Sequence, residues 1–431
     1  MKGNFQIILI IIFIVAAVFG VLVFSGAIPI GDQSSQPGGR GIVTLWGTAP
    51  TQMITPILKE FNDANPSFVV NYVEKFPETF NSDLLEALAS GQGPDIFFIT
   101  DDLIWSYANK IFVIPYESFP LSSFKNSFAG AGEVFLTSQG ILAFPISIDP
   151  LMLYYNRSML DANNIVYPPA FWDELVAIVP LLNERNESNQ LTRGAVAMGQ
   201  FANITHAKDI LATLFMQAGN PVVEEVDGFL RSSLGQFSGG SGLGPVLEFY
   251  TDFADPLQTS YAWNRSFPNS SEAFSSEKLA FYFGFASEFP SLVSRNPNQD
   301  FLVATVPQIK GTNFKLTSAR VTGLAVSAFS RNLETALLAS SLMATGNFAE
   351  QFSSATGVAP ARRDLIARSP GGAYLPTFYQ SALFARSWLD PNPIASNDIF
   401  RIMIESVLSG VATPADSVRD ASGRLELLLF R

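Results

Sequence analysis

Cysteine is absent from all 431 residues of the chain. Disulfides, thiolate nucleophiles, Cys-ligated metals and a lipid-modified cysteine are therefore excluded. Histidine occurs once, as His206, which leaves few means for acid–base or metal chemistry. Because His206 stands where a helix is expected to begin, we interpret it as a structural or surface residue. We predict no catalytic residue, no metal site and no cofactor, so the sequence indicates a protein that is not an enzyme.

Charged residues are also scarce, at 15% of the chain, and acidic ones outnumber basic ones 38 to 26. The resulting net charge of -12 argues against nucleic acid as a partner, because phosphates require surfaces rich in Lys and Arg. An uncharged or cationic solute suits this balance. Apolar residues make up 48% and Phe occurs 38 times, so the body of the chain is expected to be globular.

A long apolar run occurs at the N-terminus, where residues 7–24 are uncharged and mostly apolar. Such a run is long enough to cross most of a bilayer. It is either an uncleaved anchor or a signal peptide cleaved near Ser25-Gly26-Ala27. Because it exceeds the usual apolar region of a signal peptide, the anchor is favoured. We assign residues 1–26 to this anchor or signal segment and the Gly- and Ser-rich residues 27–41 to a flexible linker. The body is expected to be exported.

From Ile42 onward, short β-type runs alternate with helical ones. Strands are predicted at 42–46, 68–73 and 95–99, with intervening helices that end at Asn65-Pro66 and at Gly91. This β-α-β-α-β order is typical of a doubly wound, mainly parallel sheet, whose ligand site lies at the carboxyl ends of the strands. The loops after Trp46 and after Ile99 are therefore candidate parts of a binding site.

Several segments occur in the order and spacing of one known family, although each is weak by itself. They cover residues 46–47, 61–66, 85–96, 144–149, 153–156, 171–175, 278–284, 303–307, 323–327, 356–362 and 402–414. With these segments the chain resembles the family 1 extracellular solute-binding proteins, the maltodextrin-binding-like class that serves ABC sugar importers. Single differences, such as Glu277 and Phe281 before and within one expected strand, do not alter the expected packing.

The resemblance implies an α/β protein with the two-lobed, type II periplasmic-binding-protein fold, in addition to the N-terminal transmembrane helix. Each lobe is expected to be a doubly wound sheet built from a discontinuous chain. We expect lobe 1 at residues 42–148 and 302–345, and lobe 2 at residues 149–301 and 346–431. The function implied is that of the extracytoplasmic subunit that captures a carbohydrate, an oligosaccharide or polyol, by hinge closure and delivers it to ABC importer permeases.

Binding a sugar between two lobes requires aromatic faces for the ring and carboxylates for the hydroxyls. Eight residues are candidates for the ligand-binding site: Trp46, Gly47, Thr48, Asp102, Asp149, Phe285, Trp263 and Trp388. By resemblance, the loop of Trp46, Gly47 and Thr48 borders the cleft, and Asp102, Asp149 and Phe285 occupy sugar-facing positions. Trp263 and Trp388 are added because both lie in polar, loop-like stretches. Each residue has a structural alternative: the rings as core residues, Asp102 as a helix cap and Asp149 as a cap at the lobe crossover.

Two positions depart from the maltodextrin binders: Ile99 and Leu103 replace an aromatic ring and an arginine. Maltodextrin itself is therefore in doubt as the solute. Two other functions stay open, a membrane-anchored sensor or adhesion protein with the same fold, and a binder of peptide or polyamine. We expect a monomer on the outer face of the cytoplasmic membrane, anchored by its N-terminal helix.

Overall fold

The computed structural model describes residues 41–226, 228–235, 242–368 and 370–430. The predicted membrane segment lies outside these residues, as does the linker except for its last residue, Gly41, which begins the first strand. Both assignments stay predictions. Among the described helices, none combines the length and the apolar character that crossing a bilayer requires.

The first part of the chain forms the alternating strands and helices that the sequence predicts. In order they are β1 (Gly41–Gly47), α2 (Thr51–Ala64), β2 (Phe68–Glu74), α3 (Phe80–Ala89) and β3 (Ile96–Thr100). Strand β1 pairs in parallel with both β2 and β3. Helix α2 buries Ile54, Ile57, Leu58 and Phe61 on one face, which is the helical spacing seen in the sequence.

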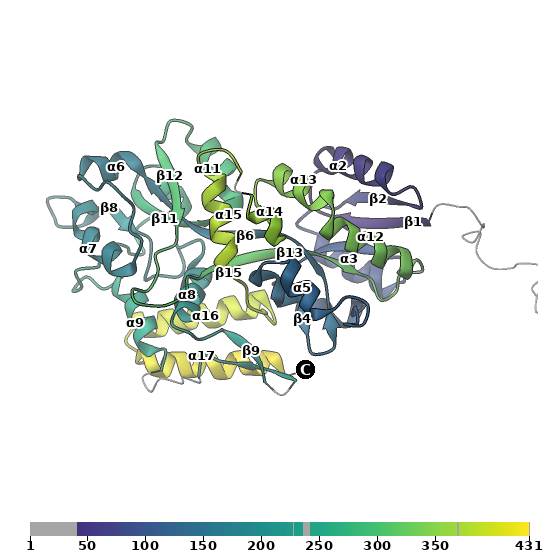
Figure 1. Ribbon diagram of the computed structural model, residues 1–431. Coiled ribbons are helices and arrows are strands. Elements are labelled where there is room, and N and C mark those ends of the chain that lie inside the picture. Colours follow the sequence, from purple (N-terminus) through teal and green to yellow (C-terminus); the bar gives the residue numbers. More distant parts are fainter. Residues whose placement is uncertain (1–40, 227, 236–241, 369, 431) are drawn as a thin grey trace, which may run out of the picture.

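A mixed sheet joins two lobes through one long strand, β6 (Phe144–Asn156). Within the described residues, the sheet has 11 strands and its main order is β2-β1-β3-β13-β6-β11-β8-β7. The first half of β6 pairs antiparallel with β13 (Thr317–Val326), and the second half pairs antiparallel with β11 (Leu279–Phe285) and β12 (Phe301–Thr305). The sheet is therefore mixed rather than mainly parallel. Figure 1 shows β6 and β13 between the two lobes.

The lobes have separate hydrophobic cores. The first lobe holds two clusters around β1–β3 and the first half of β6, and the second lobe holds one large cluster around β11 and the second half of β6. Other elements of the first lobe are α4 (Ile104–Tyr107), η1 (Ala108–Lys110), α5 (Leu121–Ser127), η2 (Gly130–Phe135), β4 (Leu136–Thr137), β5 (Gly140–Ile141), α12 (Leu333–Thr345), α13 (Asn347–Thr356), β14 (Ala359–Pro360) and α14 (Arg363–Ile366).

The second lobe is covered mainly by helices. Its other elements are α6 (Arg157–Ala162), α7 (Trp172–Leu182), β7 (Glu184–Arg185), β8 (Leu191–Val196), α8 (Ala207–Gln217), β9 (Val223–Val226), β10 (Phe229–Ser232), α9 (Gly244–Asp252), α10 (Ser270–Ser275), η3 (Ala286–Glu288), α11 (Phe289–Arg295), α16 (Pro393–Leu408) and α17 (Pro414–Leu429). Helix α15 (Leu375–Phe384) contributes to both cores, and β15 (Ala385–Arg386) pairs with β13.

Packing differs from the expected lobe boundaries at two segments. Strand β12 was expected in lobe 1, but it pairs with the half of β6 that belongs to the second lobe. The segment of α13, β14 and α14 was expected in lobe 2, but it packs in the first lobe. Phe348 of α13 lies against Phe61 of α2, with ring centroids 5.9 Å apart, and Ala359 and Leu365 belong to the first-lobe clusters. The reason is that edge pairing and the direction of an apolar helix face are set by long-range contacts, which local patterns do not contain.

Candidate functional site between the lobes

A cavity of about 420 Å³ lies where the two lobes meet. Its walls come from the loop after β3, the N-terminus of α8, the strand β13 and the segment that leads into α16. The lining residues are Asp101, Asp102, Thr205, His206, Lys208, Asp209, Ser318, Ala319, Arg320, Ser387, Trp388, Asp390, Pro393 and Asn397. A groove of about 740 Å³ between α2 and α13 is larger, but only first-lobe residues line it. The smaller cavity is the candidate site because both lobes contribute to it and because it lies at the carboxyl end of the parallel strand β3.

Two adjacent carboxylates, Asp101 and Asp102, form the first-lobe wall directly after β3. Asp101 is 7% exposed and accepts hydrogen bonds from the Val321 backbone N–H, at 2.9 Å, and from the Ser387 hydroxyl. Burial, and then the neighbouring charge of Asp102, raise the pKa of Asp101 to about 7. Asp102 accepts a hydrogen bond from Thr100. In the described chain no basic side chain lies within ion-pair distance of either carboxylate.

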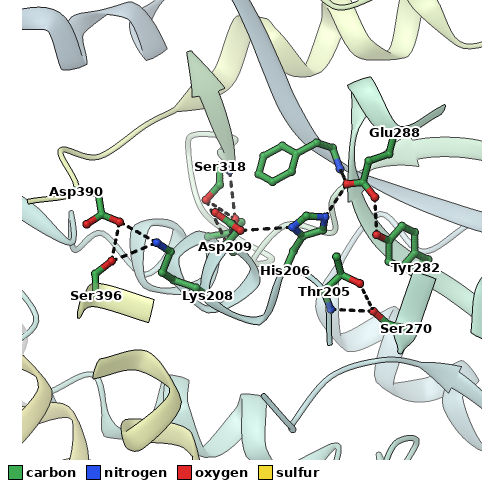
Figure 2. A network of polar contacts seen from close by, with 12 residues as sticks. Thr205, His206, Lys208, Asp209, Ser270, Tyr282, Glu288, Ser318, Asp390 and Ser396 are labelled. Carbon is green, nitrogen blue, oxygen red and sulfur yellow. Dashed lines mark hydrogen bonds and ion pairs between the residues drawn. The ribbon is translucent and has the colours of Figure 1, made fainter. Parts of the chain in front are cut away.

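His206 forms part of the second-lobe wall and lies between two carboxylates (Figure 2). Its Nε2 is 2.6 Å from Glu288 Oε1, and its Nδ1 is 3.6 Å from Asp209 Oδ2. Glu288 also accepts hydrogen bonds from the Tyr282 hydroxyl and the Phe285 backbone N–H. Burial alone lowers the pKa of His206, but the bonds to Asp209 and Glu288 outweigh it and raise this pKa to about 9. At neutral pH the ring is therefore a cation that is fully engaged within the wall.

Lys208 pairs with Asp390 on the other side of the same helix end, as Figure 2 shows. The two charged atoms are 2.8 Å apart, and the side chains are only 15% and 4% exposed. Ser396 donates a hydrogen bond of 2.7 Å to the same carboxylate. This ion pair joins α8 to the segment before α16 and holds Trp388, whose half-buried ring lies 5.6 Å from the Lys208 ammonium.

Arg320 projects from β13 at the junction and is exposed. Its guanidinium carbon is 4.0 Å from the centroid of the Phe285 ring, a cation–π contact. Across the strand pair, Arg320 stands opposite Asp149 of β6. Asp149 accepts a hydrogen bond of 2.9 Å from the Ser287 backbone N–H, and burial raises the pKa of Asp149 to about 6.

Of the eight residues predicted from the sequence, Asp102 and Trp388 line the cavity. Asp149 lies beside it, half-buried and opposite Arg320. Phe285 is 1% exposed, with Arg320 over its ring and the His206 ring centroid 4.9 Å away. Trp263 is 0% exposed and stacks on Phe267 at 4.4 Å in the second-lobe core. In this conformation neither of these two rings presents a free face to a solute.

The three residues at the end of β1 lie in the first lobe and do not line this cavity. Trp46 is half-buried under the Lys75 ammonium, which lies 3.8 Å from the ring centroid. Thr48 is exposed. A Cβ at Gly47 would lie 2.5 Å from the Phe98 ring, so close packing accounts for the glycine at this position. A role of these three residues at the solute stays a prediction.

Sequence reasoning did not select Asp101, Lys208, Asp209, Arg320 or Asp390, and it interpreted His206 as structural or surface. His206 is indeed only 7% exposed, but it also lines the cavity. The Asp101-Asp102 doublet after a buried strand was a usable signal. A single arginine within the β-type run 317–326 was another. The remaining residues are brought together only by the fold.

The model of the bacterial extracellular solute-binding protein family matches residues 57–376, which is more than half of the chain. The chain belongs to this family. Family members bind solutes outside the cytoplasm and are not enzymes, which confirms the expectation that this chain has no catalytic role.

Several solved structures share the fold of this chain. One is a cyclo/maltodextrin-binding protein complexed with maltotetraose, with 18% identity, a TM-score of 0.72, and coverage of 91% of this chain and 98% of the other. Another is a cyclic alpha-maltosyl-1,6-maltose binding protein from Arthrobacter globiformis, with 17% identity, a TM-score of 0.73, and coverage of 91% and 99%. A third, from Listeria monocytogenes, is an ABC substrate-binding protein in complex with cycloalternan, with 17% identity, a TM-score of 0.66, and coverage of 90% and 98%. They show that this solute-binding protein has the two-lobed, periplasmic-binding-protein-like α/β fold with a curled mixed sheet.

Proposed function

We propose that the protein captures a carbohydrate in the cavity between its lobes and delivers it to the permease subunits of an ABC importer. Structural neighbours of this chain hold maltotetraose, cycloalternan and acarbose as bound molecules. The proposal includes the type II topology with doubly wound lobes, and an N-terminal helix at residues 7–24 that anchors the protein to the membrane.

One observation carries the proposal: the polar groups of the cavity that remain unpaired match the two faces of a hydroxyl group. On the first-lobe wall, Asp102 is an acceptor, because one of its carboxylate oxygens accepts from Thr100 and the other has no partner among the described residues. Arg320 is a donor at the junction. A sugar hydroxyl both donates and accepts, so a row of hydroxyls can bridge these groups. The half-buried ring of Trp388 adds an apolar surface for the C–H face of a pyranose.

Capture requires the bound solute to favour the closed arrangement of the lobes over the open one. Strands β6 and β13 run between the lobes, so a small change of their backbone angles moves the two walls relative to each other. A solute that touches Asp102 on one wall and the α8 side on the other is held best when the walls approach. That differential affinity supplies the free energy of closure.

The test is a ligand screen on wild-type protein. The melting temperature is measured by following thermal unfolding through intrinsic tryptophan fluorescence. The panel contains neutral oligosaccharides, polyols, peptides and polyamines, and the detergent has no sugar headgroup. We expect at least one carbohydrate to raise the melting temperature, by an amount that grows with its excess over the dissociation constant. X-ray scattering with that carbohydrate should show a more compact molecule. If only peptides or polyamines raise the melting temperature, the carbohydrate proposal fails.

A further inference from the structure

Arg320 differs from the other basic residues that line the cavity. Lys208 is neutralised by Asp390, and His206 is neutralised by Asp209 and Glu288. In the part of the chain that the structure describes, the Arg320 guanidinium takes part in no hydrogen bond and no ion pair, and its contact is with the ring of Phe285. Its N–H donors therefore face the cavity without a protein acceptor.

Phe285 and the strand β13 together set the direction of the guanidinium. The guanidinium carbon lies 4.0 Å from the centre of the Phe285 ring, and that ring is itself only 1% exposed. On β13, the neighbouring residues Ser318 and Ala319 also line the cavity. Ser318 is hydrogen-bonded to Thr213 at 2.7 Å, so this strand is tied to α8 of the second lobe. The donor group is therefore positioned before any solute arrives, which lowers the entropic cost of binding.

Carboxylates surround this guanidinium on several sides. Against the effect of burial, which raises each pKa, the positive charge of Arg320 lowers the pKa values of Asp101, Asp149 and Asp209. A carboxylate on the solute would be repelled by these three groups. Two neighbouring hydroxyl oxygens are neutral, so they can accept hydrogen bonds from the planar guanidinium of Arg320 without being repelled by the carboxylates.

We propose that Arg320 is a specificity-determining contact, whose guanidinium donates to two neighbouring hydroxyl oxygens on the edge of a neutral sugar ring. This inference rests on the proposed function and deepens it. Phe285 then serves as the platform of the arginine and not as the stacking ring of the sugar. A sugar bound in this way presents its hydroxyl edge to β13. The aromatic ring available for stacking against the face of the sugar is then that of Trp388.

The experiment is a calorimetric titration of wild-type protein and Arg320→Met with maltotetraose, cycloalternan, cellobiose, xylobiose, trehalose and tagatose. For the neutral carbohydrate that wild type binds best, the Met variant should bind roughly 10- to 100-fold more weakly. Arg320→Lys should recover only part of the loss, because an ammonium lacks the planar fork. Arg419→Met, which removes an exposed arginine of α17, should bind as wild type does.

A purely structural role for Arg320 as counter-ion of the nearby carboxylates gives a different result. Repeating the titration at about pH 5 and about pH 8 separates a donor role from a counter-ion role. Asp101 and Asp149 are largely protonated at the lower pH, and Asp209, whose pKa is lowered, keeps the His206 cation as its partner. If Arg320 donates to the sugar, the loss in the Met variant persists at both values. Recovery of affinity at about pH 5 would overturn the inference while the proposed function stands.

The charge of the solute provides a second criterion. Glucuronic acid should bind wild type more weakly than glucose does, and Arg320→Met should not reverse this order. A uronic acid that binds more tightly than its neutral counterpart would overturn the neutral-edge inference. If wild type binds no carbohydrate of either kind, the proposed function fails and the inference fails with it.

Discussion

The charged side chains on the two walls of the cavity differ in whether they form ion pairs within the protein. On the second-lobe wall, Lys208 and His206 are each bonded to carboxylates within the protein. On the first-lobe wall, Asp101 and Asp102 accept hydrogen bonds but have no cationic partner among the described residues. The second-lobe wall is therefore a preassembled frame. On the first-lobe wall, one carboxylate oxygen of Asp102 has no partner among the described residues and keeps free acceptor capacity.

This difference has a physical consequence for binding. A buried ion pair costs much to separate, so the second-lobe wall contributes shape more than hydrogen bonds to a solute. Free carboxylate oxygens are desolvated when the lobes close, and that cost is offset only if hydroxyl donors replace the lost water. Solutes rich in hydroxyls are therefore selected at the first-lobe wall.

The largest effect is expected on stability when the second-lobe frame is broken by Lys208→Met. The change leaves the Asp390 carboxylate, 4% exposed, without its cation, and should lower the free energy of unfolding by about 3–5 kcal/mol in urea titration. Adding Asp390→Asn should recover most of the loss, since no buried charge is then left. The matched change Lys59→Met, in a pair that is 75% and 66% exposed, should cost less than about 1 kcal/mol. If Lys208→Met and Lys59→Met lost equal stability, the ion pair of the second-lobe wall would be no more important than an exposed surface pair.

The next effect concerns the pH dependence of stability that Asp101 imposes. Its pKa is about 7 in the folded chain and about 3.9 when unfolded, so folding favours the protonated form. The free energy of unfolding should therefore fall as pH rises from about 4 to about 7. The asparagine of Asp101→Asn cannot ionise. At about pH 8 the free energy of unfolding of this variant should therefore be higher than that of wild type by on the order of 2 kcal/mol, and near pH 4 the two should differ little.

Urea titration across this range checks the prediction for Asp101. Asp420→Asn, at an exposed position of α17, serves as the control and should follow the wild-type curve. A difference between Asp101→Asn and wild type that stays constant from about pH 4 to about pH 8 would count against a buried, proton-binding Asp101.

A third effect, of similar size, is expected on affinity rather than stability, at the first-lobe wall. Asp102→Asn removes a charged acceptor that lines the cavity, and should weaken binding of a neutral carbohydrate by about 1.5–3 kcal/mol with the melting temperature of the free protein unchanged. Asp149→Asn should lose less, because that carboxylate already accepts the Ser287 N–H. Calorimetric titration of both variants ranks them. A greater loss at Asp149 would place the solute nearer to β6 than the cavity suggests.

Local patterns were sufficient for a large part of the architecture. The predicted strands at 42–46, 68–73 and 95–99 correspond to β1, β2 and β3, and the helix before Asn65-Pro66 ends at Ala64. Burial of one face of a strand or helix produces an apolar periodicity, and this periodicity is visible in residues that are close together in the sequence. The loop after the buried strand β3 was readable as a candidate site for the same reason, and the resemblance then singled out Asp102 within it. Resemblance of ordered segments added the family, which the match over residues 57–376 confirms.

Other features were decided only by the tertiary structure. Lys208 and Asp390 are 182 positions apart in the chain, and Arg320 meets the ring of Phe285 from a different strand. Trp263 and Trp388 both lie in polar stretches, yet one is in the core and the other lines the cavity. Local spacing determines which face of an element is apolar, but the burial, pairing and pKa of a side chain depend on what the rest of the fold places against it. The sequence by itself therefore determined the order of the elements and the family, and the long-range packing of β6, β13, α8 and α16 decided which side chains meet at the cavity.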